Sequence, residues 1–109
     1  MAKYGVVILG EGIHLDGAGE DVATGFVSLR SIKATDEQDA IRRVTISLLQ
    51  DWKILFNRDN KAGTPMLKAE RVKRVRNPFK KIMLSDDFMF YSSSHEKREL
   101  LEKALKVVS

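Results

Sequence analysis

The chain contains no cysteine among its 109 residues. Without thiols it can form neither a disulfide framework nor a thiolate metal site, and it has no cysteine nucleophile. Long apolar stretches are missing as well. The longest runs from Tyr4 to Leu9, far short of the roughly 20 residues that a membrane-spanning helix needs.

The position of this run directly after Lys3 suggests a secretory signal, but two features argue against one. Its apolar core is too short, and Glu11 follows where a signal peptide would need small residues for cleavage. We therefore expect a buried strand at this position and a cytoplasmic protein that does not bind membranes.

The composition is that of a globular protein. Hydrophobic residues make up 43% and charged residues 31% of the chain, which does not fit a disordered sequence. The length is near the commonest domain size, so we expect residues 1–109 to form a single domain that needs no metal or disulfide to fold.

Two strands are predicted in the first third of the chain. Residues 3–9 are apolar on both faces, which indicates a central strand, and residues 13–15 continue it beyond Gly10-Glu11-Gly12. A polar, glycine-bearing turn over residues 16–21 leads to the second strand, residues 25–34. The apolar positions of that strand do not alternate strictly, which predicts a bulge or a change of face.

Two amphipathic helices are predicted, each opened by a capping box. Thr35 with Gln38 opens the first, which ends near Phe56, and Ser93 with Glu96 opens the second. Apolar residues recur in both at spacings of three and four. These positions are Ile41, Val44, Leu48, Leu49, Trp52, Leu55 and Phe56 in the first helix, and Leu100, Leu101, Ala104, Leu105 and Val108 in the second.

Two further strands complete the expected fold. Residues 66–76 form the third and end before Pro78, and residues 88–91 form the fourth after a turn at 85–87. The element order is therefore ββαββα. We predict an α+β protein, a small sandwich of a predominantly antiparallel sheet with two amphipathic helices.

Several motif-like patterns lack the residues that their chemistry requires. Gly10-Glu11-Gly12 resembles the start of a dinucleotide fingerprint, but Leu15 occupies the third glycine position and no helix follows. Residues 57–63 resemble a calcium loop, but Arg58 stands at its first position, where a carboxylate is needed. We expect a strand bulge and a surface loop instead.

No catalytic or metal site can be assembled from the sequence. The two histidines, His14 and His95, lie on separate elements, and no further ligands stand at recognisable spacing. His14 next to Asp16 is best explained as a chance neighbour in a turn. We therefore expect a protein that is not an enzyme and that has no cofactor and no bound metal.

Residues 68–81 are the most informative segment. Seven of these fourteen side chains are cationic and Glu70 is the single anion, so the segment carries +6 in a chain of net charge +4. Residues 1–40, by contrast, sum to −4. Clustered lysine and arginine are typical of phosphate binding. Acidic and basic segments can also neutralise each other, within one fold or between two copies.

Alternation along a strand places Arg71 and Lys73 on one face and Arg74 and Arg76 on the other, and the apolar residues between them select no buried side. Charge on both faces is typical of an edge strand protected against aggregation. It also fits an arm that projects past the sheet, where Phe79 could stack on single-stranded nucleic acid. The candidate nucleic-acid or anion-binding residues are Arg71, Lys73, Arg74, Arg76, Lys80 and Lys81.

Two functional hypotheses follow. The first is a small cytosolic, non-enzymatic α+β protein that acts through protein–protein contacts or self-association, with a homodimer as one form. The alternative is a nucleic-acid-binding module that uses residues 68–81, whose affinity would fall steeply with salt.

Overall fold

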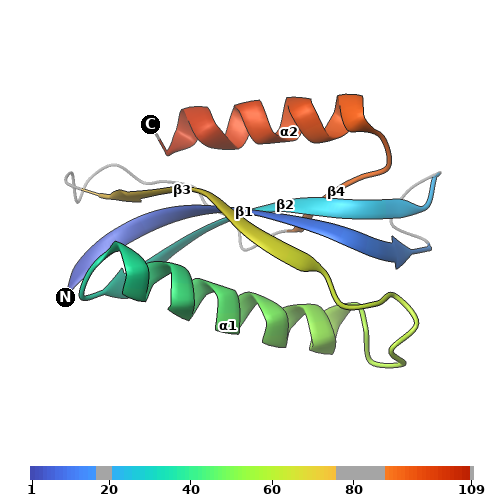
Figure 1. The fold of residues 1–109 in the computed structure, drawn as a ribbon, viewed down its shortest axis with the longest axis horizontal. Coiled ribbons are helices and arrows are strands. Elements are labelled where there is room, and N and C mark those ends of the chain that lie inside the picture. Colours follow the sequence, from blue (N-terminus) through green and yellow to red (C-terminus); the bar gives the residue numbers. More distant parts are fainter. Residues whose placement is uncertain (17–20, 76–87, 109) are drawn as a thin grey trace.

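The computed structural model describes residues 1–16, 21–75 and 88–108. The elements follow the order β1-β2-α1-β3-β4-α2, as Figure 1 shows. The strands are β1 (Ala2–Leu15), β2 (Ala23–Ala34), β3 (Met66–Arg74) and β4 (Phe88–Tyr91), and the helices are α1 (Glu37–Leu55) and α2 (Ser94–Val107). The predicted α+β class is confirmed.

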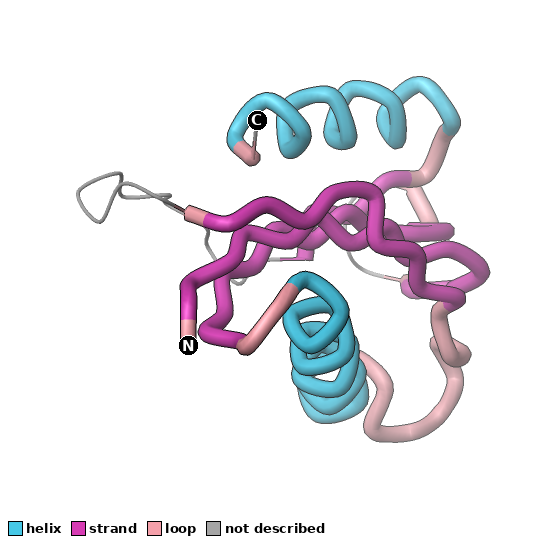
Figure 2. Tube along the Cα trace, turned by 60° about the vertical axis from the view of Figure 1, so that its left-hand side comes forward, coloured by secondary structure: helices cyan, strands magenta, loops and turns pink. Residues whose placement is uncertain are grey.

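The four strands form one antiparallel sheet in the order β3-β1-β2-β4. The β1–β2 hairpin lies in the centre, and within the described residues β3 and β4 are the edges. The two helices cover opposite faces of the sheet (Figures 1 and 2), so the molecule has three layers.

Burial on both faces explains the apolar pattern of the central strands. In β1, Val6 and Ile8 belong to the core under α1, whereas Val7 and Leu9 belong to the core under α2. In β2, Phe26 belongs to the core under α1, whereas Val27 and Leu29 belong to the core under α2. The irregular pattern of β2 therefore reflects a second covering helix, and the predicted bulge or face change in that strand was wrong.

The bulge lies in β1 instead. Glu11 pairs with Gly25 and Leu15 pairs with Ala23, so β1 contains two more residues than β2 over this interval. Gly12, in the bulge, has a φ of 77°, a left-handed conformation that glycine adopts without strain. The expectation that Gly10-Glu11-Gly12 marks a strand irregularity is thus confirmed.

The cap of α1 differs from the prediction by one residue. Asp36 is the N-cap, and its carboxylate accepts a hydrogen bond of 2.8 Å from the Asp39 amide. Thr35 donates through its amide and its hydroxyl to Asp39, at 3.0 and 3.2 Å, instead of accepting a bond from the helix. Aspartate caps a helix as well as threonine does, so the N-cap lies one position later than predicted.

The central residues of the apolar stripe of α1 pack on the sheet, whereas Leu55 near its end does not. Val44, Leu48 and Trp52 are buried, and the Trp52 ring lies 5.6 Å from the Phe26 ring, centroid to centroid. Trp52 also donates to the Gly63 carbonyl at 2.9 Å, which holds the loop after α1. Leu55, predicted on the buried stripe, is 63% exposed because α1 ends there.

The cap of α2 follows the prediction. Ser93 is the N-cap and accepts a bond of 3.2 Å from the Glu96 amide. The Glu96 carboxylate accepts from the Ser93 hydroxyl at 3.3 Å, whereas in a full capping box it would accept from the Ser93 amide. The apolar side of α2 packs on the core that contains Val7 and Leu9. The predicted turn at residues 85–87 and the break at Pro78 lie outside the described residues.

Candidate nucleic-acid interface

Among the described strands the basic strand β3 is an edge of the sheet, which agrees with one of the two interpretations of its charge pattern. A bulge in β3 determines on which side of the sheet its cations lie. Ile8 of β1 pairs with Ala69 and Val7 pairs with Arg71, which leaves Glu70 as an extra residue in β3. Because side chains alternate along a strand, Arg71 and Lys73 share the side of Val7, which α2 covers.

The other side of β3 faces α1. Leu67, Ala69 and Val72 pack against the core under that helix, so the expectation that the apolar residues of this strand select no buried side was wrong. Arg74 pairs with Tyr4 and shares this α1 side. Of the predicted site residues, Arg71 and Lys73 are therefore together and Arg74 is separate, while Arg76, Lys80 and Lys81 lie outside the described residues.

Two lysines that the sequence analysis did not select join Arg71 and Lys73. Lys3 of β1 pairs directly with Lys33 of β2, and both share the side of Val7 and Leu29. Gly5, between Lys3 and Val7, pairs with Lys73 on one neighbour and with Ser31 on the other. We call Lys3, Lys33, Arg71 and Lys73 the α2-side basic surface.

The surface has a net positive charge that its surroundings do not neutralise. All four side chains are exposed. Within the described part of the chain, none of them forms an ion pair with aspartate or glutamate. Arg71 donates to the Leu105 carbonyl in the last turns of α2 at 3.1 Å, which fixes its guanidinium beside the helix. The other three cations are lysines, and among residues 1–16, 21–75 and 88–108 no hydrogen bond anchors their side chains in this way.

Acidic residues of the N-terminal third pair with other cations. Asp39 bonds Arg42 and Arg43 of α1, and Glu11 lies 3.4 Å from Lys97 of α2. Among the residues that the structure describes, the acidic segment therefore does not neutralise the basic strand within the fold. This excess charge is available to a ligand or to another molecule.

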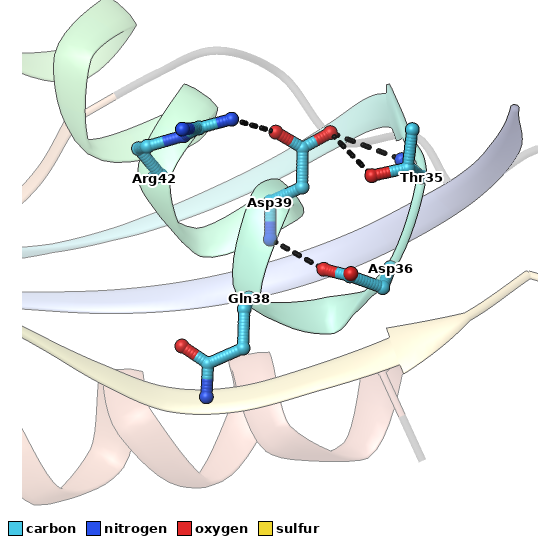
Figure 3. A pocket seen from close by; sticks show the side chains of 5 residues that line it. All are labelled: Thr35, Asp36, Gln38, Asp39 and Arg42. Atoms are coloured by element: carbon cyan, nitrogen blue, oxygen red, sulfur yellow. Dashed lines mark hydrogen bonds and ion pairs between the residues drawn. The ribbon is translucent and has the colours of Figure 1, made fainter.

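A hollow of about 360 Å³ at the N-terminus of α1 is a second place to consider. It is lined by Thr35, Asp36, Gln38, Asp39 and Arg42 (Figure 3). Hydrogen bonds from the Thr35 amide, then from Arg42 and Arg43, hold the pKa of Asp39 well below its usual range. Since both carboxylate oxygens of Asp39 are engaged by the protein itself, this hollow is explained as a helix cap.

A second hollow, of about 340 Å³, lies at the N-terminus of α2. Tyr91 lines it and donates to the Gly10 carbonyl at 3.1 Å. Burial, with a further contribution from the charge of Glu11, raises the pKa of Tyr91 to about 12. The Tyr91 hydroxyl therefore serves as a structural donor at neutral pH and is poorly suited to act as a base.

Two remaining titratable groups do not form a site. His14 lies 3.8 Å from Asp16, but both side chains are mostly exposed, which fits a solvated pair in a turn. Arg30 is buried on the α1 side, where it bonds Asp51 at 2.8 Å and Ser47 at 3.3 Å. The ion pair between Arg30 and Asp51 therefore links β2 to α1.

Comparison of the chain with protein-family models, with curated proteins and with solved structures gave no match. In the described ranges, neither helix is long and apolar enough to cross a membrane. The α2-side basic surface is therefore the feature of the molecule that points to a function.

Proposed function

We propose that this protein is a non-enzymatic binding protein whose α2-side basic surface contacts the phosphates of a nucleic acid. The observation that carries the proposal is the direct pairing of Lys3 with Lys33 across two strands, with Lys73 on the neighbouring strand. Like charges directly opposite each other destabilise a sheet, by an amount comparable to the roughly 0.2–1 kcal/mol of a favourable pair. Bound phosphate would offset that repulsion.

The spread of the cations favours a polymer over a single phosphate group. Lys33 lies on β2 and Lys73 on β3, with β1 between them. Adjacent strands are about 4.8 Å apart, so the two backbones are separated by about 10 Å. A single phosphate can contact only some of these cations, whereas successive phosphates of a nucleic acid can contact all of them at once.

The test is binding of a fluorescently labelled oligonucleotide, followed by anisotropy at low salt. We compare the wild type with Lys33→Gln/Lys73→Gln and with the control Lys53→Gln/Lys61→Gln. Both variants lower the net charge from +4 to +2. Of the two control lysines, Lys53 lies in the last turn of α1 and Lys61 lies in the loop that follows. In this loop the Ala62 carbonyl accepts a bond from the His14 amide, so the loop lies at the end of β1 opposite to Lys3.

We expect the first variant to lose at least about 10-fold in affinity and the control to lose less than about 3-fold, because only the first removes phosphate contacts. Equal losses would mean that net charge alone determines binding. No binding by the wild type at low salt would contradict the proposal.

Self-association, or contact with another protein, is the second candidate function. Three apolar side chains are exposed around the loop between α1 and β3: Ile54 (54%), Leu55 (63%) and Met66 (76%). Large exposed apolar patches are typical of protein-contact sites, and these side chains are the candidates for such a patch. Sedimentation velocity over a wide concentration range tests this candidate, with Leu55→Ser/Met66→Ser as the variant that should shift a dimer towards monomer.

A further inference from the structure

The α2-side basic surface contains cations but no accessible aromatic ring among the described residues. The rings of Phe26, Trp52, Phe56, Phe88 and Phe90 contact one another in the core under α1, on the other side of the sheet. Tyr91 does belong to the α2 side, but it is 5% exposed and its hydroxyl is bonded to Gly10.

This distribution bears on the kind of nucleic acid that would bind. Proteins that hold single strands combine cations with aromatic side chains on which the bases stack, each worth about 1–3 kcal/mol. Phe79, which suggested stacking from the sequence, lies outside the described residues. The described surface offers contacts to phosphate without contacts to unpaired bases.

The shape of the surface also argues against reading of base edges. The major groove of B-DNA is about 12 Å wide and admits one helix or a two-stranded ribbon. The cations here come from three adjacent strands of a sheet, beside which α2 lies (Figure 1). Three strands already span about 10 Å between their outer backbones before side chains are added, so this surface is too broad to enter the groove.

The residue types of the four cations also argue against reading of base edges. Arginine is the residue that most often reads guanine, through two parallel hydrogen bonds. The one arginine of the surface, Arg71, already donates to the Leu105 carbonyl. Lysine acts as a compact point charge that contacts phosphate without a fixed geometry.

We infer that the ligand of the α2-side basic surface is a nucleic-acid duplex, held through its phosphate backbone without recognition of base sequence. The inference rests on the proposed function and specifies its ligand. Phosphate contacts position a protein on a duplex but carry no direct sequence information.

The test compares labelled ligands of equal length under one buffer condition. They are two DNA duplexes of unrelated sequence, the component single strands, and an RNA duplex of one of the two sequences. We expect the two DNA duplexes to bind within about 2-fold of each other and at least about 5-fold more tightly than either single strand, since a duplex has the higher charge density. The RNA duplex shows which duplex geometry the surface prefers.

The possible outcomes distinguish failure of the duplex inference from failure of the proposed nucleic-acid binding. Tighter binding of single strands, lost in Lys33→Gln/Lys73→Gln, would overturn the duplex inference and leave the proposed function standing. A preference above about 10-fold for one duplex sequence would also overturn it, because backbone contacts alone do not discriminate to that extent. Failure of every ligand to bind would contradict the proposed function itself.

Discussion

Lys3 and Lys33 lie directly opposite each other in the β1–β2 ladder, with both side chains on the side of the sheet that α2 covers. Neither forms an ion pair with an acidic residue of the described chain. Such an arrangement lowers the stability of the sheet and raises its affinity for anions, which supports the proposed binding surface.

This relationship predicts a variant that gains stability and loses binding. Lys33→Glu would replace a repulsive cross-strand pair by an attractive one, and we expect the free energy of unfolding to rise by about 0.2–1 kcal/mol at low salt. The gain should shrink as salt screens the pair. Urea denaturation at two salt concentrations measures it, with Lys61→Glu as the control at an exposed loop position. A loss of stability in Lys33→Glu would show that the two lysines do not repel each other.

Packing under α1 predicts that truncating Trp52 lowers the free energy of unfolding strongly and that truncating Leu55 lowers it little. Trp52 is 2% exposed and packs on Phe26, so Trp52→Ala should lower the free energy of unfolding by about 3–5 kcal/mol. Leu55 lies on the same helix but is 63% exposed, and Leu55→Ala should cost less than about 1 kcal/mol. Chemical denaturation of both variants checks the pair. Similar costs would mean that the face of α1 is misassigned.

Because Arg30 is buried and bonded to Asp51, we predict that substitutions at these two residues have non-additive effects on the free energy of unfolding. The Nη1 atom of Arg30 donates to Asp51 at 2.8 Å. Among the described residues, the Nη2 atom of Arg30 is buried without a hydrogen-bond partner. Asp51→Ala would leave the guanidinium charge without its carboxylate, and we expect a loss of about 1–3 kcal/mol. Arg30→Met/Asp51→Ala should recover part of that loss, because an apolar side chain suits the site. Additive effects in the double-mutant cycle would show that the two residues do not interact.

The raised pKa of Tyr91 predicts that part of the free energy of unfolding is lost at high pH. Burial raises its pKa from the ordinary value of 10.0 to about 12, so the folded protein favours the neutral phenol. This contribution is fully present below about pH 10 and is lost as the pH rises towards 12. We expect the stability of the wild type to fall more steeply over this interval than that of Tyr91→Phe. Parallel pH profiles in urea denaturation would indicate that the phenol titrates normally.

The helices and strands could be predicted because their periodicity and caps are strong local signals. Trp52 lies on a stripe of apolar residues at helical spacing and is buried, as predicted. Ser93 caps the second helix by accepting a bond from the Glu96 amide, as predicted. The cap of α1 was misplaced by one residue because Thr35 and Asp36 are both good capping residues, and local sequence does not choose between them.

The basic surface could be predicted only in part, because it depends on register between strands. A slip of one residue turns every side chain of a strand to the opposite face. Two irregularities set the register here: the additional residues of β1 between Glu11 and Leu15, and the extra Glu70 in β3. They bring Lys3 opposite Lys33 and place Arg71 on the same side. Gly10 and Gly12 indicate the first irregularity but not the number of additional residues, and no local pattern indicates the second, so Lys3 and Lys33 were not selected.

The most direct test of the basic surface is the salt dependence of duplex binding. Each phosphate contact contributes about −0.9 to the slope of log K against log salt concentration, so four cations predict a slope of about −3.6. Lys33→Gln/Lys73→Gln should reduce the slope to about −1.8, and Lys53→Gln/Lys61→Gln should leave it near the wild-type value. Salt-insensitive binding, or the same slope in the wild type and both variants, would contradict the assignment of phosphate contacts to this surface.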